Sequence, residues 1–143
     1  MSPLTPPSKE IVILVVDDEV VVRNFVQRVL SGEGFSVLVA GNGHEALQLS
    51  RAFSGTIHML LTDVEMPGID GFQVAEQLRV SMPHMRIMFM SGKLADTRTE
   101  PANFLSKPFQ PQALVARVRE TLSDLLSTKG TPLDAASDAE LLS

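Results

Sequence analysis

Residues that could do chemistry follow four apolar runs of this sequence, at the point where each run ends. In chain order these residues are Asp17, Asp18 and Glu19; Asp63; Ser91 and Gly92; and Lys107 with Pro108. A carboxylate can act as a nucleophile or hold a hard metal ion, and a lysine can neutralise an acid or a phosphate oxygen. Each set alone has a plainer explanation, because acids before a helix also stabilise its N-terminus. Their joint occurrence predicts a single site.

Three carboxylates in one pocket need a compensating charge. Asp17, Asp18 and Asp63 would repel one another there, and burial would shift their pKa values. A divalent cation is the simplest relief, and Mg²⁺ prefers carboxylates, a carbonyl and water, often with a phosphate. We therefore expect a Mg²⁺ site, with Mn²⁺ as a second candidate.

The elements that must position these residues alternate between strand-like and helical patterns. Such alternation is typical of an α/β fold with a parallel sheet. The expected strands are 11–16, 36–40, 57–62, 86–91 and 103–106. The expected helices are 20–31, 43–53, 71–80 and 111–126. Because ligands bind outside the carboxyl ends of strands in such sheets, the four sets of polar residues should meet at one edge.

Composition bounds the class of protein. The chain has 143 residues, 44% hydrophobic and 20% charged, which fits one globular domain. It has no cysteine, which excludes disulfides and thiol chemistry. The net charge of −5 argues against a nucleic-acid surface. No apolar run approaches the roughly 20 residues of a membrane span, and no signal segment is visible, so we expect a cytoplasmic protein without membrane contact.

The domain organisation is expected to be simple. We predict a flexible N-terminal segment over 1–9, one domain over 10–127 and a flexible tail over 128–143. About 17 residues follow the last predicted helix, too few for a helix-turn-helix output domain.

Four motifs occur in the order typical of a known family. They are "LVVDDE", "LLTDVEMPGIDG", "FMSGK" and "NFLSKPF". Together they resemble the receiver domain of two-component response regulators, over about Ile11 to Leu126. The resemblance implies a flavodoxin-like, doubly wound sheet of five parallel strands in the order 2-1-3-4-5, with helices on both faces.

The resemblance also implies roles for the acids. Asp63 corresponds to the phosphorylated aspartate. Asp17 and Asp18 correspond to the acidic pair that binds Mg²⁺. Asp63 and the backbone carbonyl of Glu65 correspond to the other ligands of this metal ion.

The remaining motif residues correspond to the switch of that family. Ser91 matches the hydroxyl residue that contacts the phosphoryl group, and Lys107 matches the lysine of the site. Pro108 matches a proline that is typically cis. Phe104 falls on the switch aromatic, and since it lacks a hydroxyl we expect it to act by packing alone.

Two departures from the family pattern bear on signalling. Ser91 and Lys107 are 16 positions apart, and the intervening segment contains Pro101 and two Thr residues, so we expect the fourth helix to be shortened or missing. Glu65 and Lys93 occupy positions that border the route of the hydrolytic water. They could pair and slow dephosphorylation, or be two solvated side chains.

The function expected from these residues is that of a phosphoacceptor, not a turnover enzyme. The phosphodonor would be a histidine kinase or a histidine phosphotransfer protein, and the output an unknown downstream protein, with the chain a monomer or weak homodimer. A Mg²⁺-dependent phosphohydrolase with an aspartyl nucleophile is the alternative. A flavin-binding domain fits poorly, because the acidic turn after the first strand would repel the flavin phosphate.

Overall fold

The sheet is the frame on which the site is built. The computed structural model describes residues 10–92 and 103–130. Its five strands are all parallel, in the order β2-β1-β3-β4-β5. They are β1 (Val12–Val16), β2 (Ser36–Ala40), β3 (Met59–Asp63), β4 (Arg86–Ser91) and β5 (Phe104–Ser106). The five predicted strands and their order are confirmed, although the third begins at Met59, two residues later than predicted.

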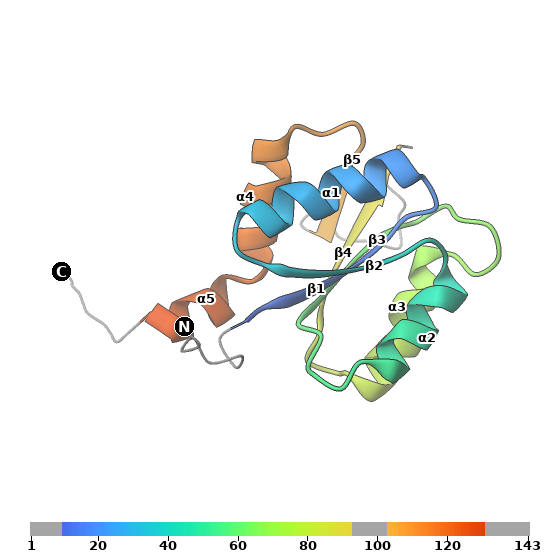
Figure 1. Cartoon of the computed structure of the whole chain (residues 1–143), viewed down its shortest axis with the longest axis horizontal. Helices are drawn as coiled ribbons and strands as arrows, with labels where there is room; N and C mark the ends of the chain where they lie inside the picture. The colour runs from blue at the N-terminus through green and yellow to red at the C-terminus, as the bar shows by residue number, and fades with distance from the viewer. Residues whose placement is uncertain (1–9, 93–102, 131–143) are drawn as a thin grey trace.

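Helices cover both faces of the sheet. They are α1 (Val20–Gly32), α2 (Gly43–Ala52), α3 (Gly71–Ser81), α4 (Pro111–Thr121) and α5 (Ser123–Gly130). Helices α1 and α4 lie against one face, and α2 and α3 against the other, as Figure 1 shows. The predicted doubly wound architecture is therefore confirmed.

The central strands are apolar at every position because both of their faces are buried. In β1, Ile13 and Val15 pack in the cluster under α1 and α4. Leu14 and Val16 pack in the cluster under α2 and α3. Such two-sided burial holds the strand ends rigidly, and the polar residues that follow β1 and β3 inherit this rigidity.

Two helices begin at side-chain caps. Asn42 accepts a hydrogen bond from the backbone of Glu45 at the start of α2. Asp70 and Gln73 form a reciprocal capping box at the start of α3. These caps satisfy backbone N–H groups that a helix leaves without internal partners.

The prediction of one continuous last helix over 111–126 is wrong. The helix stops at Thr121, and a separate α5 begins at Ser123. The Thr121 hydroxyl donates to the carbonyl of Arg117 at 2.8 Å, a bond that tends to bend helices. Leu122, at the break, is fully buried against the sheet, so the chain turns where its side chain enters the core.

Several predictions fall on other parts of the chain. The fourth helix was expected to be short or missing within 93–102, which lies outside the described residues. The flexible ends, 1–9 and 128–143, lie outside them too except for the last turn of α5, and the domain limits stay a prediction.

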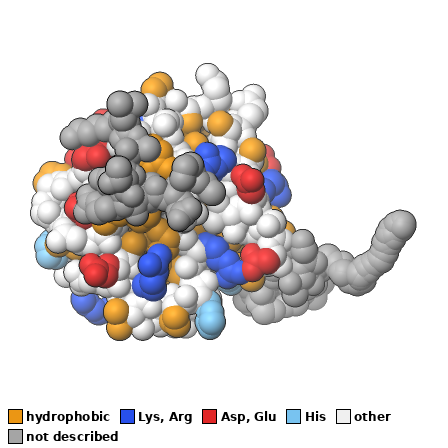
Figure 2. All heavy atoms as spheres, turned by 180° about the vertical axis from the view of Figure 1, so that it is seen from behind, with side chains coloured by type: hydrophobic (Ala, Val, Ile, Leu, Met, Phe, Trp, Pro, Cys, Tyr) orange, Lys and Arg blue, Asp and Glu red, His pale blue; other side chains and the backbone are white. Residues whose placement is uncertain are grey.

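The described surface carries mixed charge. On the face shown in Figure 2, acidic and basic side chains are interspersed with hydrophobic ones. None of the described helices combines the length and the apolar composition that a bilayer crossing requires.

Candidate functional site

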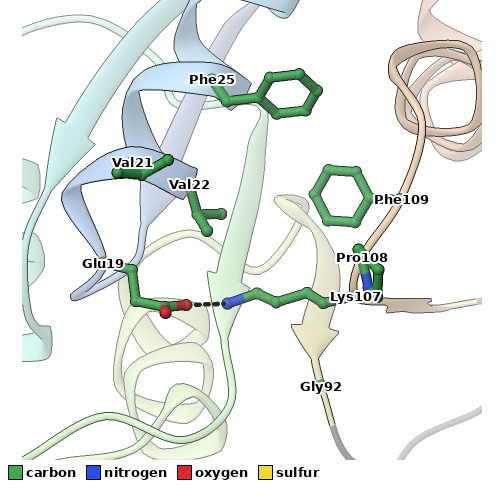
Figure 3. Close-up of a pocket in the computed structure, with 8 residues that line it drawn as sticks. All are labelled: Glu19, Val21, Val22, Phe25, Gly92, Lys107, Pro108 and Phe109. Atoms are coloured by element: carbon green, nitrogen blue, oxygen red, sulfur yellow. Dashed lines mark hydrogen bonds and ion pairs between the residues drawn. The ribbon is translucent and has the colours of Figure 1, made fainter.

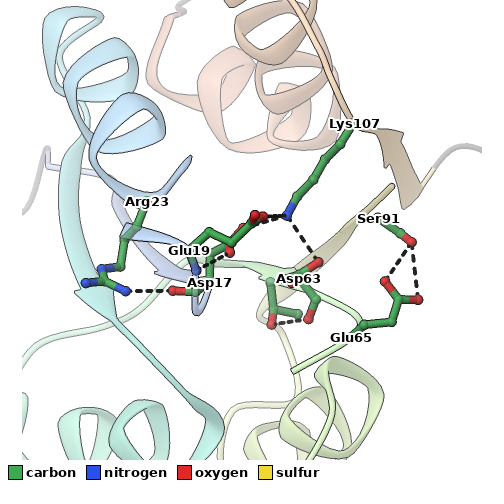
Figure 4. Close-up of polar contacts among 8 residues, drawn as sticks. Asp17, Glu19, Arg23, Asp63, Glu65, Ser91 and Lys107 are labelled. Atoms are coloured by element: carbon green, nitrogen blue, oxygen red, sulfur yellow. Dashed lines mark hydrogen bonds and ion pairs between the residues drawn. The ribbon is translucent and has the colours of Figure 1, made fainter. Parts of the chain in front are cut away.

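Lys107 lies at the centre of the acidic residues that follow β1 and β3. Its Nζ lies 2.9 Å from Asp17 Oδ2, 3.2 Å from Glu19 Oε1 and 3.3 Å from Asp63 Oδ1. Figure 4 shows the lysine reaching from its strand end toward all three acids. Asp17 and Asp63 are buried, whereas Glu19 is exposed. The lysine thus supplies the positive charge that keeps the two buried carboxylates together.

The three carboxylates among the predicted metal ligands meet at this edge. One carboxylate oxygen from each of Asp17, Asp18 and Asp63 can be chosen so that all lie within 4.8 Å of one another. Asp18 is exposed to solvent, so the cluster opens outward. An all-oxygen donor set with an open side is the chemistry that Mg²⁺ favours, since Mg²⁺ keeps several of its waters. The residues present therefore fit this metal.

Burial sets the protonation behaviour of the central acid. It raises the pKa of Asp63 from 3.8 to about 6; the charge of Lys107 opposes this rise, and those of Asp17 and Glu65 add to it. Burial acts to lower the pKa of Lys107, but the hydrogen bond to Asp17 and the charges of Asp17 and Asp63 outweigh it, so the net shift is upward. Above about pH 6, Asp63 is therefore mainly an anion beside a firmly protonated lysine.

Backbone contacts fix the strand ends relative to one another. Val64 N donates to Met90 O at 2.9 Å, and Lys107 N donates to Ser91 O at 2.8 Å. These bonds tie the ends of β3, β4 and β5 into one rim. These backbone bonds therefore fix how far apart the backbones of Asp63 and Lys107 lie, whatever the conformation of their side chains.

Gly71 is required by a close approach to this rim. A Cβ at this position would lie 2.2 Å from the carbonyl oxygen of Asp63, a distance that a side chain cannot adopt. The first turn of α3 can therefore pack directly behind the acid. Nearby, Gly68 has φ of +82°, which allows the sharp turn after Pro67.

Glu65 and Ser91 meet on the other side of Asp63. The Ser91 hydroxyl donates to Glu65 Oε1 at 2.9 Å and lies 3.3 Å from Oε2. Ser91 is buried and Glu65 is exposed. The sequence left two alternatives for Glu65 and Lys93, a pair or two solvated side chains; Lys93 lies outside the described residues, so both stay predictions.

The remaining predicted residues lie close to the site. The Lys107–Pro108 peptide bond is cis. Phe104 is buried in the core cluster that also holds Phe89, its register partner on β4. Its ring therefore already occupies the interior.

Two contacting residues were given no specific role from the sequence. Glu19 contacts Lys107 directly, although only its neighbours Asp17 and Asp18 were assigned to the site. Arg23 Nη1 donates to the backbone carbonyl of Asp17 at 2.7 Å. The sequence signal for Glu19 was that it directly follows Asp17 and Asp18 in the "DDE" motif. Arg23 lies one helical turn after Glu19 and therefore points back toward the strand end.

An apolar groove borders Lys107. Its volume is about 560 Å³, and its apolar lining includes Val21, Phe25, Pro108 and Phe109. Figure 3 shows the Phe25 and Phe109 rings above the Glu19–Lys107 ion pair. Val21 is 81% exposed and borders this groove. An exposed apolar surface of this kind is typical of interaction sites.

Comparison with known proteins identifies relatives. The profile of the response regulator receiver domain matches residues 13–119. The sensor kinase CckA of Brucella abortus is 35% identical over 116 residues, which is 77% of this chain and 12% of the relative. ArcA, the aerobic respiration control protein of Escherichia coli K12, is 31% identical over 117 residues, 78% of this chain and 48% of the relative. The chain thus spans at most about half the length of these two proteins.

Solved structures agree with these matches. The receiver domain of the hybrid histidine kinase CckA has a TM-score of 0.68 and 39% identity, covering 78% of this chain and 98% of that one. The response regulator TrrA of Thermotoga maritima, solved in complex with Mg²⁺–BeF, has a TM-score of 0.68 and 31% identity, covering 78% of this chain and 99% of that one.

Proposed function

Because this chain belongs to the response regulator receiver domain family of two-component signal transduction, we propose that Asp63 is its phosphoacceptor. The observation that carries the proposal is the convergence of Asp17, Glu19 and Asp63 on Lys107, with Asp63 at the end of a fully buried strand. Asp63 is the buried acid of this group that ends β3, and its carboxylate lies 3.3 Å from Lys107.

The reaction follows from the placement of these groups. A carboxylate oxygen of Asp63 attacks the phosphorus of a phosphohistidine and forms an acyl phosphate. The phosphorus–nitrogen bond breaks, and the histidine nitrogen keeps the electron pair and takes up a proton. Lys107 can neutralise a phosphoryl oxygen, so catalysis consists of positioning and charge compensation.

Metal binding is part of the proposal. Asp17, Asp18, Asp63 and the backbone carbonyl of Glu65 would hold Mg²⁺, or alternatively Mn²⁺. The bound ion would supply positive charge beside the transferring oxygens. The oxygen-only donor set and the Mg²⁺–BeF complex of TrrA support this assignment.

Ser91 and Phe104 are proposed as the switch. The Ser91 hydroxyl would donate to a phosphoryl oxygen on Asp63. Phe104 packs beside β4, the strand that Ser91 ends, so a shift of Ser91 would change the packing of this ring. In this way a local change of charge would alter the surface near β4 and β5.

The phosphodonor is proposed to dock on the apolar groove beside Lys107. Receiver domains of response regulators accept their phosphoryl group from histidine kinases. A donor histidine must come within bonding distance of Asp63, so its protein has to cover the adjoining rim. Val21 and Phe109 would provide the apolar contact area there.

Stoichiometric labelling distinguishes this function from turnover. The phosphohydrolase considered from the sequence is not favoured, because the matches are to receiver domains. We propose that the chain accepts one phosphoryl group and later loses it by hydrolysis. Steady release of phosphate from phosphomonoesters would instead support the hydrolase.

The test is phosphorylation by a small donor. Incubation with acetyl phosphate and Mg²⁺, followed by intact mass, should give one phosphate adduct on the wild type and none on Asp63→Asn. Asp70→Asn is the matched control, because Asp70 caps α3 and Asn is an equally good cap. An adduct that survives Asp63→Asn would refute the assignment.

A further inference from the structure

The Ser91 hydroxyl already has an acidic partner before any phosphoryl group arrives. It donates to Glu65 Oε1 at 2.9 Å and lies 3.3 Å from the second oxygen, as Figure 4 shows. Ser91 is 2% exposed, so its hydroxyl is largely withdrawn from water. The proton of this hydroxyl is thus engaged by a carboxylate before phosphorylation.

The chemistry of serine makes this contact competitive. A hydroxyl carries one proton and can donate it to one acceptor at full strength. Hydrogen bonds to a carboxylate are roughly twice as strong as neutral ones. Ser91 therefore cannot satisfy Glu65 and a phosphoryl oxygen on Asp63 at the same time.

We propose that Glu65 is a latch for Ser91: its carboxylate holds the hydroxyl in the unphosphorylated protein and has to be displaced when Asp63 gains its phosphoryl group. This inference rests on the phosphoacceptor role proposed for Asp63. It makes Glu65 a positioning residue that acts through Ser91 and opposes phosphorylation.

The charge of Glu65 acts in the same direction as the hydrogen bond. Glu65 is two residues from Asp63, and its negative charge contributes to raising the pKa of that carboxyl. A phosphoryl group brings further negative charge to the same place, and like charges at such short range repel. Both the held hydroxyl and the repulsion thus favour the unphosphorylated form.

The test removes the charge of Glu65 while keeping its shape. Glu65→Gln still offers an oxygen to Ser91, but as a weaker, neutral acceptor. At saturating Mg²⁺ we expect its rate of phosphorylation by acetyl phosphate, and its affinity for beryllofluoride, to rise by about three- to tenfold. Glu10→Gln is the matched control, since Glu10 is exposed and precedes β1 at the opposite edge of the sheet. It should leave both quantities unchanged.

A double-mutant cycle decides whether the effect passes through Ser91. In a Ser91→Ala background, Glu65→Gln should raise beryllofluoride affinity by less than half of its effect in the wild type, because only the charge effect remains. Equal effects in the two backgrounds would overturn the latch, as would no effect in the wild type. If the wild type itself forms no adduct, the proposed function fails and the latch with it. If the wild type and Glu65→Gln form the adduct at equal rates, the latch is refuted but the proposed function is not.

Discussion

The acids on the two sides of Asp63 are held by different means. On the lysine side, Asp17 and Glu19 form ion pairs with Lys107. On the serine side, Glu65 accepts a hydrogen bond from the neutral hydroxyl of Ser91. Both sides meet at the same buried carboxylate, which itself pairs with Lys107.

The difference separates a fixed part of the site from an exchangeable one. Lys107 carries a full charge, it is only 14% exposed at its side chain, and its strand end is tied to β4, so the lysine side keeps its geometry. Ser91 is neutral, so it can change partner by rotating its hydroxyl without breaking an ion pair. The lysine side is therefore suited to placing a phosphoryl group, and the serine side to responding to it.

Removing the lysine should have the largest effect. Lys107→Met keeps the length of the side chain but leaves two buried acids without their cation. We expect metal-free protein to lose about 3–5 kcal/mol of unfolding free energy, the range typical of breaking a buried pair. Phosphorylation by acetyl phosphate should fall by two orders of magnitude or more.

Added Mg²⁺ then tests whether Lys107 stabilises the fold through its charge or through its packing. Because the cation relieves the same repulsion, it should restore more stability to Lys107→Met than to the wild type. Urea unfolding with and without Mg²⁺ measures this difference. Arg28→Met, at an exposed position of α1, should stay within about 0.5 kcal/mol of the wild type. A metal-independent loss in Lys107→Met would mean that the lysine acts by packing.

The buried acid should itself reduce the stability of the metal-free fold. Burial raises the pKa of Asp63 from 3.8 to about 6, so the ionised form costs folding free energy. Asp63→Asn removes that charge, and we expect it to gain about 1–2 kcal/mol at pH 7.5. Chemical unfolding in EDTA as a function of pH is the measurement.

The pH dependence has a definite sign. Between pH 4 and 6, Asp63 binds more protons in the folded protein than in the unfolded chain, so the destabilisation caused by this one carboxyl is relieved as the pH falls through that window. The advantage of Asp63→Asn is therefore present above pH 6 and should vanish toward pH 4. Asp18→Asn is the control; its acid is exposed, so it should gain less than half as much. An advantage that does not change with pH would contradict the charge explanation.

The sequence predicted the sheet and the lysine side well, for physical reasons. Short apolar runs rich in β-branched residues, such as Ile11–Val16, are typical of strands buried on both faces, and the acids after them meet at the carboxyl edge of a parallel sheet. Asp17, Asp63 and Lys107 were therefore placed without any tertiary information.

The serine side and the last helix could not be predicted in the same way. Glu65 and Ser91 are 26 residues apart, and whether Glu65 reaches Ser91 depends on the course of the loop after β3. Charge alone suggested Lys93 as its partner. The break at Leu122 depends on a local hydroxyl bond of Thr121 and on burial of one leucine, neither of which disturbs the helical spacing of the sequence.

The smallest expected effect concerns Arg23, which extends the lysine side to the backbone. Its guanidinium donates to the carbonyl of Asp17 at 2.7 Å, while the Asp17 side chain accepts from Glu19 N at 2.9 Å. Arg23 thus holds the peptide that carries two of the three clustered acids. Arg23→Met should weaken Mg²⁺ binding by about threefold, the worth of one hydrogen bond.

The direction in which the Mg²⁺ affinity of Arg23→Met changes decides how Arg23 acts. Loss of a nearby positive charge, taken alone, would tighten the binding of a divalent cation. Weaker binding in Arg23→Met therefore requires that Arg23 acts by holding the Asp17 backbone, and tighter binding would show that its charge dominates. Calorimetric titration with Mg²⁺ distinguishes the two, with Arg28→Met as the matched loss of charge from the same helix. If Arg23 does hold the backbone, the lysine side extends beyond its ion pairs into the first turn of α1.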